Sequence, residues 1–281
     1  VWRPGAAGRA IPCVPPVLPS IGGRSPASAG RTPNGAPGRC FFAGVRWAVF
    51  SARMHPSATG ERERTSPPNG WGEGLRNVYR NLIAQGAHNI NLVTPTHFLP
   101  AILESLEPKL PVPVVYNCGG YEKVETLRRL EGKVQIYLPD LKYYASELSA
   151  RYSAAPDYFA VASLALREMF RQVGAVRFDE NGILQGGMVV RHLVLPGAHK
   201  DSLQLLDWLA GEFSPGEIRL SLMSQYTPPA GITIKELQRP VFTYEYRKVC
   251  DRAAELGFLG YTQERCSADA AYTPPFDGTG L

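Results

Sequence analysis

From residue 78 onward, apolar runs of strand length alternate with segments of helical periodicity, and no other feature constrains the fold of this chain more. The expected strands are "NINLV", "PVPVVYN", "VQIYLPD", "GMVVRHLVLPG", "EIRLSLMSQY" and "LGYTQE". Such alternation is typical of βα units, whose parallel strands are buried on both faces and joined by helices. The sequence therefore predicts one barrel-like α/β domain over residues 77–281.

The segments between these strands have the spacing of amphipathic helices. They read "VYRNLIAQGA", "HFLPAILESLE", "EKVETLRRLEG", "SLQLLDWLAGEF" and "TYEYRKVCDRAAELG", and further helical segments lie within residues 145–173. In a barrel built from such units, catalytic and binding residues lie at the carboxyl ends of the strands. The chemistry of this chain is therefore expected in the turns that follow the strands.

The first 76 residues differ in composition from the rest. They contain ten Arg, no Lys and three acidic residues, a balance of +7, whereas residues 77–281 have a balance of −2. They also contain 23 Gly and Pro residues. A segment with little apolar periodicity cannot offset the entropy of ordering, so we expect residues 1–76 to be irregular. Because the basic character is confined to this segment, no nucleic-acid partner is expected for the domain.

Apolar runs, the N-terminal composition and the cysteines indicate where in the cell the protein is expected. No run of 18 apolar residues occurs, so no membrane span is expected. The N-terminus lacks the apolar segment of a secretory signal, although its Arg-rich, acid-poor composition is also typical of a transit peptide. The five cysteines are scattered without CxxC pairs, which fits a reducing compartment better than a disulfide scaffold. A cytoplasmic protein is therefore expected.

Polar residues and glycines follow the expected strands at their carboxyl ends. Those singled out as candidate binding residues are Thr96, His97, Asn117, Gly119, Gly120, Asp140, Lys142, Arg191 and His192. The carboxyl ends of parallel strands meet at one edge of a sheet, so these residues should form a polar rim on an apolar barrel.

Each of these positions also has a purely structural interpretation. Gly119 and Gly120 suit a tight turn as well as direct contact with a ligand. His97, near the start of a helix, is more often a capping or surface residue than a metal ligand, since no HxxxH motif or paired carboxylate accompanies it. Asp140 and Lys142 share one face of a strand, which suits either a salt bridge or a clamp for a substrate carboxylate.

Four uninterrupted motifs carry a family resemblance. They are "AQGAHNINLVTPTHFLPAILESL", "VPVVYNCGGYEKVETLRRLEGKVQIYLPDLKYY", "VVRHLVLPGAHKDS" and "RLSLMSQYTP". On these motifs the chain resembles the radical S-adenosylmethionine proteins related to pyruvate formate-lyase activating enzyme, in their uncharacterised branch. The resemblance extends from residue 78 to the C-terminus.

The resemblance implies a partial (β/α)6 barrel that binds a 4Fe–4S cluster and S-adenosylmethionine. In that superfamily a CxxxCxxC motif ligates three irons, and the fourth iron binds the cofactor. Electron transfer from the cluster yields a 5′-deoxyadenosyl radical, which abstracts hydrogen from a protein or small-molecule substrate. An electron donor such as flavodoxin or ferredoxin is implied as a partner, and activation of a glycyl-radical enzyme is one option.

The resemblance also implies roles for the rim residues. The loop with Thr96 and His97 falls where relatives use a Gly-Gly-Glu segment for the amino group of the cofactor, so this chain departs from that pattern. Asn117 falls where the ribose is held, and Asp140 and Lys142 fall where the carboxylate end is bound. A later strand would turn Arg191 and His192 toward the cofactor.

The cluster ligands are missing from this translation. The family places its CxxxCxxC loop after a first strand that ends in "FFxGC", whereas this chain has "CFFAG" followed by Val45, and no CxxxCxxC occurs anywhere. Cys40 lacks partners four and seven residues further on. The chain as translated is therefore expected to hold no metal and to be inactive.

The genetic code offers an explanation for the loss. When the codons of residues 44–60 are read from their third bases, they permit "CALGCVFCQNAPISHG", which continues FFAG directly into CxxxCxxC. Residues 20–30, read in the same way, permit "HWGEEPCISG", which resembles the family's segment before the first strand. A frameshift in a GC-rich gene, restored between residues 68 and 78, also explains the Arg, Gly and Pro content.

Three alternatives remain open at this point. Residues 1–76 could be a real divergent segment in a relative that has lost its cluster. Lys142, at a strand end beside Asp140, could form a Schiff base as in aldolase-type barrels. The barrel could also be non-catalytic and bind only a partner protein.

Overall fold

The structure is a computed structural model of the chain, and it describes residues 49–51, 71–229 and 231–262. The parallel strands form one open sheet in the order β1-β2-β3-β4-β6-β7-β8, and β5 pairs antiparallel with β6. The strand bounds are β1 Val49–Ser51, β2 Ile90–Val93, β3 Val114–Cys118, β4 Ile136–Pro139, β5 Arg177–Phe178, β6 Leu184–Leu193, β7 Arg219–Met223 and β8 Gly260–Thr262. The predicted α/β class and parallel, partial-barrel sheet are confirmed.

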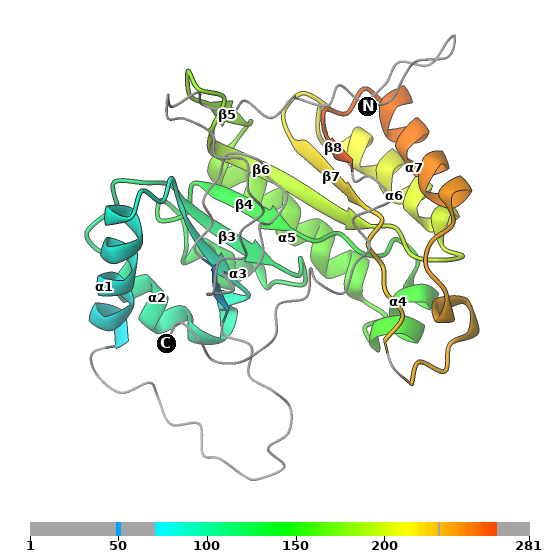
Figure 1. Ribbon diagram of the computed structural model, residues 1–281, viewed down its shortest axis with the longest axis horizontal. Helices are drawn as coiled ribbons and strands as arrows, with labels where there is room; N and C mark the ends of the chain where they lie inside the picture. Colours follow the sequence, from blue (N-terminus) through cyan, green and yellow to red (C-terminus); the bar gives the residue numbers. More distant parts are fainter. Residues whose placement is uncertain (1–48, 52–70, 230, 263–281) are drawn as a thin grey trace, which may run out of the picture.

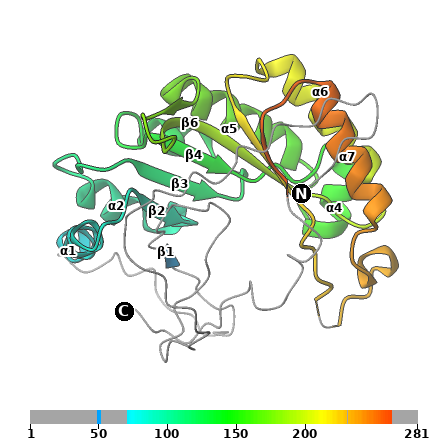
Figure 2. The same ribbon diagram turned by 45° about the horizontal axis from the view of Figure 1, so that its top comes forward.

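Helices connect consecutive parallel strands (Figure 1). They are α1 Trp71–Ala84, α2 Leu99–Ser105, α3 Val124–Arg128, α4 Ser146–Ser153, α5 Tyr158–Val173, α6 His199–Glu212 and α7 Thr243–Glu255, with 3-10 turns at Pro95–Phe98 (η1) and Lys235–Gln238 (η2). Figure 2 shows α1 and α2 near β2, and α6 and α7 together at the opposite end of the sheet.

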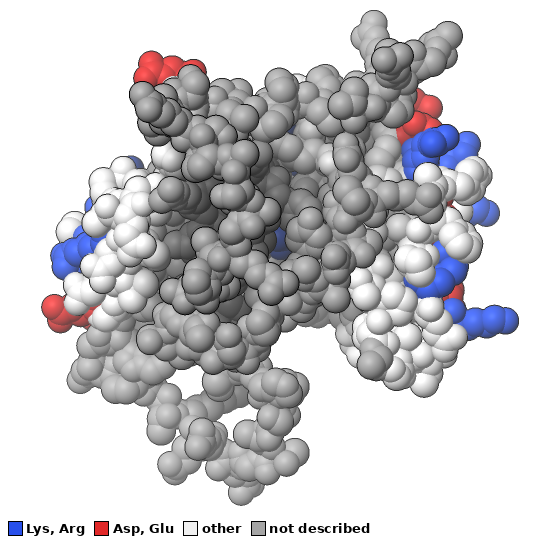
Figure 3. All heavy atoms as spheres, in the orientation of Figure 1, with Lys and Arg blue, Asp and Glu red and all other residues white. Residues whose placement is uncertain are grey.

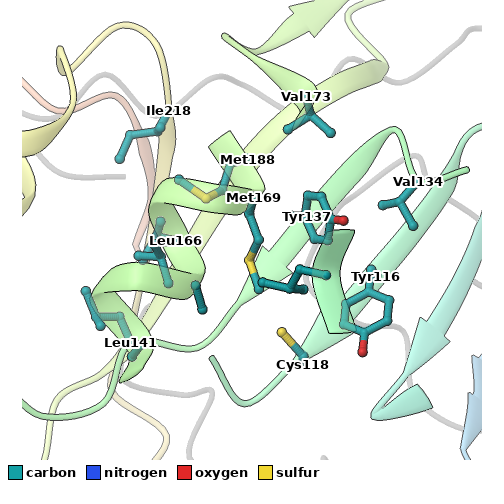
Figure 4. Packing of buried hydrophobic residues seen from close by; sticks show 14 of the residues in the cluster. Tyr116, Cys118, Val134, Tyr137, Leu141, Leu166, Met169, Val173, Met188 and Ile218 are labelled. Carbon is teal, nitrogen blue, oxygen red and sulfur yellow. The ribbon is translucent and has the colours of Figure 1, made fainter. Parts of the chain in front are cut away.

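The main core lies between the sheet and its helices. Alternate strand residues such as Tyr116, Tyr137 and Met188 belong to one apolar cluster with Leu166 and Met169 of α5, and all are fully buried (Figure 4). A smaller apolar cluster covers the other face of the sheet and contains Val115, Ile136, Leu138 and Val189. Because strand side chains alternate, residues next to one another in sequence belong to different faces. We call the face with the smaller cluster the inner face.

Helix α1 begins at Trp71, earlier than the pattern from residue 78 and earlier than the expected domain boundary at residue 77. The sequence pattern did not predict the first turn of α1 because it contains Gly72 and Gly74, and glycine disfavours helices. Contacts across to α2 stabilise this turn: Leu75 packs on the core, and Arg76 Nη1 donates a hydrogen bond of 3.0 Å to the Ser105 carbonyl. Regular structure thus enters the segment that was expected to be irregular.

Strand β1 also lies inside that segment, and it pairs in parallel with β2 from Val49 opposite Asn91 to Ser51 opposite Val93. The expected first strand at residues 40–44 and the back-translated residues 20–30 lie outside the described residues. Most of residues 44–60, on which the missing-cysteine argument depends, also lie outside them.

No helix in the described part of the chain has the length and apolar character needed to cross a membrane. In the view of Figure 3, Lys and Arg side chains occur together with Asp and Glu at both sides of the described surface. This mixture agrees with the near balance of charges in the sequence after residue 76.

Candidate functional site

Three predicted rim residues meet on the inner face at the carboxyl ends of the central strands. Asp140 follows β4 and pairs with Arg191 of β6 in an isolated parallel bridge. Arg191 Nη2 lies 2.6 Å from Asp140 Oδ1 and donates a hydrogen bond of 2.7 Å to Asn117 Oδ1 on β3. The arginine therefore spans β4 and joins side chains from three strands. We call Asn117, Asp140 and Arg191 the rim triad.

The rim triad has unused hydrogen-bonding capacity. Asp140 Oδ1 is buried and forms an ion pair with Arg191, but no donor approaches this oxygen at hydrogen-bonding geometry. Arg191 Nε is also buried without an acceptor. Leaving a buried polar atom unpaired costs about 1–3 kcal/mol, so such atoms are usually satisfied by water or a ligand. A donor without an acceptor and a carboxylate oxygen held by an ion pair alone thus lie at the edge of the apolar inner face.

Lys142 and Gly119 lie beside the triad. Lys142 Nζ is 3.9 Å from Asp140 Oδ2, and its side chain is 45% exposed. A Cβ built on Gly119 would lie 3.9 Å from the same ammonium, with nothing else near it. The predicted Asp140–Lys142 pair is therefore present as a long, half-exposed ion pair. An exposed lysine that faces a carboxylate lacks the desolvation that activates Schiff-base lysines.

Gly120 has a structural role. Its φ is +77°, and a Cβ at this position would lie 2.0 Å from the Asp140 carbonyl oxygen. Only glycine fits where the loops after β3 and β4 approach so closely.

Thr96 belongs to a separate cluster with two residues that the sequence analysis did not single out. Its Oγ1 lies 2.8 Å from the Tyr116 hydroxyl and donates to both carboxylate oxygens of Glu122, at 2.9 and 3.0 Å. Glu122 is 7% exposed, and this burial raises the pKa of its carboxyl group. Nothing in the sequence pattern signals a buried carboxylate directly after an exposed tyrosine. His97 is exposed, and its proximity lowers the pKa of Glu122 by less than burial raises it.

His192 lies on the opposite face from Arg191, and the expectation that both face one ligand is wrong. Its Nδ1 lies 2.7 Å from the Leu141 carbonyl and its Nε2 lies 2.8 Å from Ser202 Oγ. The ring is 1% exposed, and burial lowers the pKa of the imidazole. The cause is the alternation of strand side chains, which sends neighbours to different faces. Its role here is to tie β6 to α6.

The described cysteines offer no metal site. Cys118 is buried on the helix-covered face, and burial raises the pKa of its thiol. Cys250 lies on α7 and packs against the core. Among residues 49–51, 71–229 and 231–262, no group of three or more His, Cys, Asp or Glu side chains could hold a metal ion.

Glu245 anchors the loops that follow β6 and β7. Its buried carboxylate accepts hydrogen bonds from Gly197 N at 2.8 Å and Phe242 N at 2.8 Å, and it forms two with Arg239. The guanidinium is the main cause that lowers the pKa of Glu245 to about 2. The side chain therefore holds Gly197, a loop residue next to the carboxyl end of β6.

Glu245→Gln is expected to lower the free energy of unfolding by about 3 kcal/mol at pH 7, because it leaves Arg239 without its buried counter-ion. Glu212→Gln removes the ion pair with Arg167 at a more exposed site and should cost less than about 1 kcal/mol. The pKa of Glu245 in the folded state lies below its unfolded value of about 4.3. The stability that the Glu245 carboxylate contributes is therefore complete above that pH and is lost as the pH falls toward 2.

Urea unfolding of the wild type and both variants at pH 7 and pH 3 measures these differences. The gap between wild type and Glu245→Gln should shrink at pH 3. A gap that stayed constant, or equal losses for the two variants, would show that the Glu245 carboxylate does not stabilise these loops.

Comparison with known proteins gives distant likenesses. No protein-family model matches the chain. The chain is 29% identical over 145 residues to "Uncharacterized protein MJ0674" from Methanocaldococcus jannaschii, a match that covers 50% of this chain and 38% of that protein. The chain thus aligns with well under half the length of this relative, whose name assigns it no activity.

Three solved structures are similar to the chain. A domain of pyruvate-formate lyase-activating enzyme from Bacteroides vulgatus has 13% identity and a TM-score of 0.41, with 71% of this chain and 96% of that one covered. A radical SAM methyltransferase from Sphaerobacter thermophilus has 12% identity and a TM-score of 0.45, with 69% and 56% covered. GH10 from Paenibacillus barcinonensis has 9% identity and a TM-score of 0.35, with 69% and 66% covered. Likenesses at this level do not assign a function, because unrelated chemistries share such folds.

Proposed function

We propose that the gene encodes a radical S-adenosylmethionine enzyme of the branch related to pyruvate formate-lyase activating enzyme, and that the rim triad with Lys142 binds S-adenosylmethionine. The sequence motifs support the family, and the unsatisfied atoms of the rim triad support the site. The observation that carries the proposal is the buried Arg191 Nε, which has no acceptor, beside Asp140 Oδ1, which is ion-paired with Arg191 but accepts no hydrogen bond, at the place where the resemblance puts the cofactor.

The residues present fit S-adenosylmethionine. The cofactor brings an ammonium, a carboxylate, ribose hydroxyls and a flat apolar base, and when bound it supplies the adenosyl group for radical chemistry. Asp140 offers an acceptor for an ammonium or a hydroxyl, and Arg191 and Lys142 offer cations for a carboxylate. The inner-face cluster of Val115, Ile136, Leu138 and Val189 supplies an apolar floor. Arg191 holds the Asn117 amide oxygen in place.

The residues present do not fit a 4Fe–4S cluster. Cluster ligation uses thiolates at close spacing, and the five cysteines of this chain provide no CxxxCxxC motif. Within the described part, Cys118 and Cys250 lie in the core on different elements. We infer that a frameshift removed the ligands, which is supported by the reading of residues 44–60 from third bases. On this account the translated chain binds the cofactor without cleaving it.

The frame-restored product would act on a protein or a small molecule and would take its electron from a donor such as flavodoxin or ferredoxin. Activation of a glycyl-radical enzyme is one such reaction. The family resemblance supports this class of reaction and of electron donor.

Titration of the full chain with S-adenosylmethionine tests the proposal. The wild type is expected to bind it with 1:1 stoichiometry, and Arg191→Gln should weaken binding about thirtyfold, because charge-assisted bonds to a ligand contribute roughly 2 kcal/mol. Arg167→Gln is the matched control, since Arg167 forms a two-bond ion pair with Glu212 away from the rim. Absence of binding by the wild type, or equal weakening in both variants, would refute the proposed site.

A further inference from the structure

The hydroxyl of Tyr158, in the first turn of α5, lies where the loops after β3 and β4 meet. It lies 3.0 Å from the Gly119 carbonyl and 3.0 Å from the Asp140 carbonyl, and it accepts a hydrogen bond of 3.1 Å from Lys142 N. A hydroxyl has one proton to donate and two lone pairs that accept. One side chain, 3% exposed, therefore serves backbone groups of three rim residues.

The ring of Tyr158 is held by the same two loops. Tyr121, from the loop after β3, stacks on it with centroids 5.9 Å apart and planes at 8°. Tyr143, from the loop after β4, meets its edge at 5.4 Å and 79°. The close approach of Gly120 to the Asp140 carbonyl shows independently that these loops are packed tightly. Both the ring and the hydroxyl therefore fix the spacing between the loops.

The remaining contacts of Asp140 and Lys142 do not replace this one. Asp140 N donates to the Cys118 carbonyl at 2.9 Å, and Leu141 N donates to the Arg191 carbonyl at 2.8 Å, so the strand itself is anchored. The Asp140 carbonyl and the Lys142 amide take no part in these two hydrogen bonds. Both pair with the Tyr158 hydroxyl. Loss of the hydroxyl would leave these two groups and the Gly119 carbonyl without this partner. The backbone of the two loops would then shift around residues 119 and 140–142.

We propose that Tyr158 is a positioning residue of the cofactor site, which sets the directions of the Asp140 carboxylate and the Lys142 ammonium through the backbone without touching the cofactor. This inference rests on the proposed function, because it concerns the same site. A displacement of about 1 Å matters for binding, because it takes a charge-assisted hydrogen bond of about 2.8 Å beyond hydrogen-bonding distance.

Tyr158→Phe keeps the ring and removes the hydroxyl. The matched control is Tyr137→Phe, since Tyr137 is fully buried on the helix-covered face and its hydroxyl donates to Gln172 Oε1 at 2.7 Å. Calorimetric titration of the full chains with S-adenosylmethionine, at a temperature where all are folded, should show about tenfold weaker binding for Tyr158→Phe, because the backbone groups that orient the site lose their shared hydrogen-bond partner. Tyr137→Phe should bind as the wild type does, although both variants lose thermal stability. Equal affinities for the two variants would overturn the proposal.

Amide hydrogen exchange gives a second readout that needs no ligand. The Lys142 amide should exchange faster in Tyr158→Phe than in the wild type and should be unchanged in Tyr137→Phe. If the wild type binds no S-adenosylmethionine, the proposed function fails, and the exchange result still decides whether Tyr158 orders these loops. Unchanged Lys142 exchange in Tyr158→Phe would overturn the inference whatever the ligand result.

A milder variant keeps the test valid if Tyr158→Phe does not fold. Tyr121→Leu removes the ring that stacks on Tyr158 and the hydrogen bond from the Tyr121 hydroxyl to Asp157. Tyr121 is 47% exposed, so the substitution leaves the core intact. It should weaken binding about threefold and speed Lys142 exchange, in line with the strength of one aromatic pair. Wild-type behaviour in both measurements would contradict the positioning role.

Discussion

A chain that carries "CALGCVFCQNAPISHG" directly after Gly44, with the printed frame resumed before α1, is expected to bind about four irons and to show the brown colour of a 4Fe–4S cluster after anaerobic reconstitution. The chain as printed should bind none at a defined site. The reason is that cluster assembly needs three thiolates within one short loop, and the printed sequence brings no such set together. Iron and sulfide content per chain, with the visible absorption spectrum, measures the difference.

The control for this experiment is the same inserted segment with its three cysteines replaced by alanine. This control has the same length and the same flanking residues as the cysteine version. Any difference in bound iron is therefore caused by the three thiolates. A stoichiometric cluster in the printed chain, or equal iron in the alanine control, would contradict the account. If the cysteine version binds S-adenosylmethionine but no iron, the cofactor site stands and the frameshift inference fails.

Gly120→Ala is expected to lower the free energy of unfolding by about 3 kcal/mol, which combines a left-handed backbone with a steric clash. The added Cβ would lie 2.0 Å from the carbonyl oxygen of Asp140, a residue whose backbone is held by its bridge to Arg191. Gly132→Ala is the matched control, because Gly132 has the same φ of +77° with nothing within 4 Å of its Cβ position. It should cost only about 1 kcal/mol.

Urea denaturation of both glycine variants measures the two costs. The difference between them reports the clash alone, since the backbone term is common to both. Equal losses would mean that the loops after β3 and β4 are farther apart in solution, and Tyr158 would then not link them.

The strands could be predicted closely because each is short, apolar and ended by Gly, Pro or a polar residue. The pattern "VQIYLPD" became β4 Ile136–Pro139, and "NINLV" became β2 Ile90–Val93. The pattern failed where local signals are weak. β5, Arg177–Phe178, has only two residues and is exposed, so it has no periodicity to detect. The helical segments expected over residues 145–173 are present as α4 and α5, and α4 ends where Ala154 adopts a left-handed conformation.

The rim could be predicted in part. The rule that polar residues collect at strand ends brought Asn117, Asp140 and Arg191 together correctly, because parallel strands in register bring these positions to one edge. The rule cannot assign faces near the end of a strand, which is why His192 was misplaced. Tyr158 and Glu122 were missed because each acts from a segment distant in sequence, Tyr158 from α5 and Glu122 across to Thr96.

The DNA sequence across the codons of residues 44–52 tests the central claim most directly. If the frame was lost there, the third bases of the Gly44, Ala48 and Ser51 codons must all be thymine, since only then do the junctions with the following codons spell cysteine at the spacing CxxxCxxC. We predict GGT, GCT and TCT at these three positions, because AGT for Ser51 would turn the phenylalanine codon of CALGCVFC into a glutamine or stop codon. Any other third base at one of them would contradict the claim, and the chain would then be a barrel that never carried its cluster loop in this place.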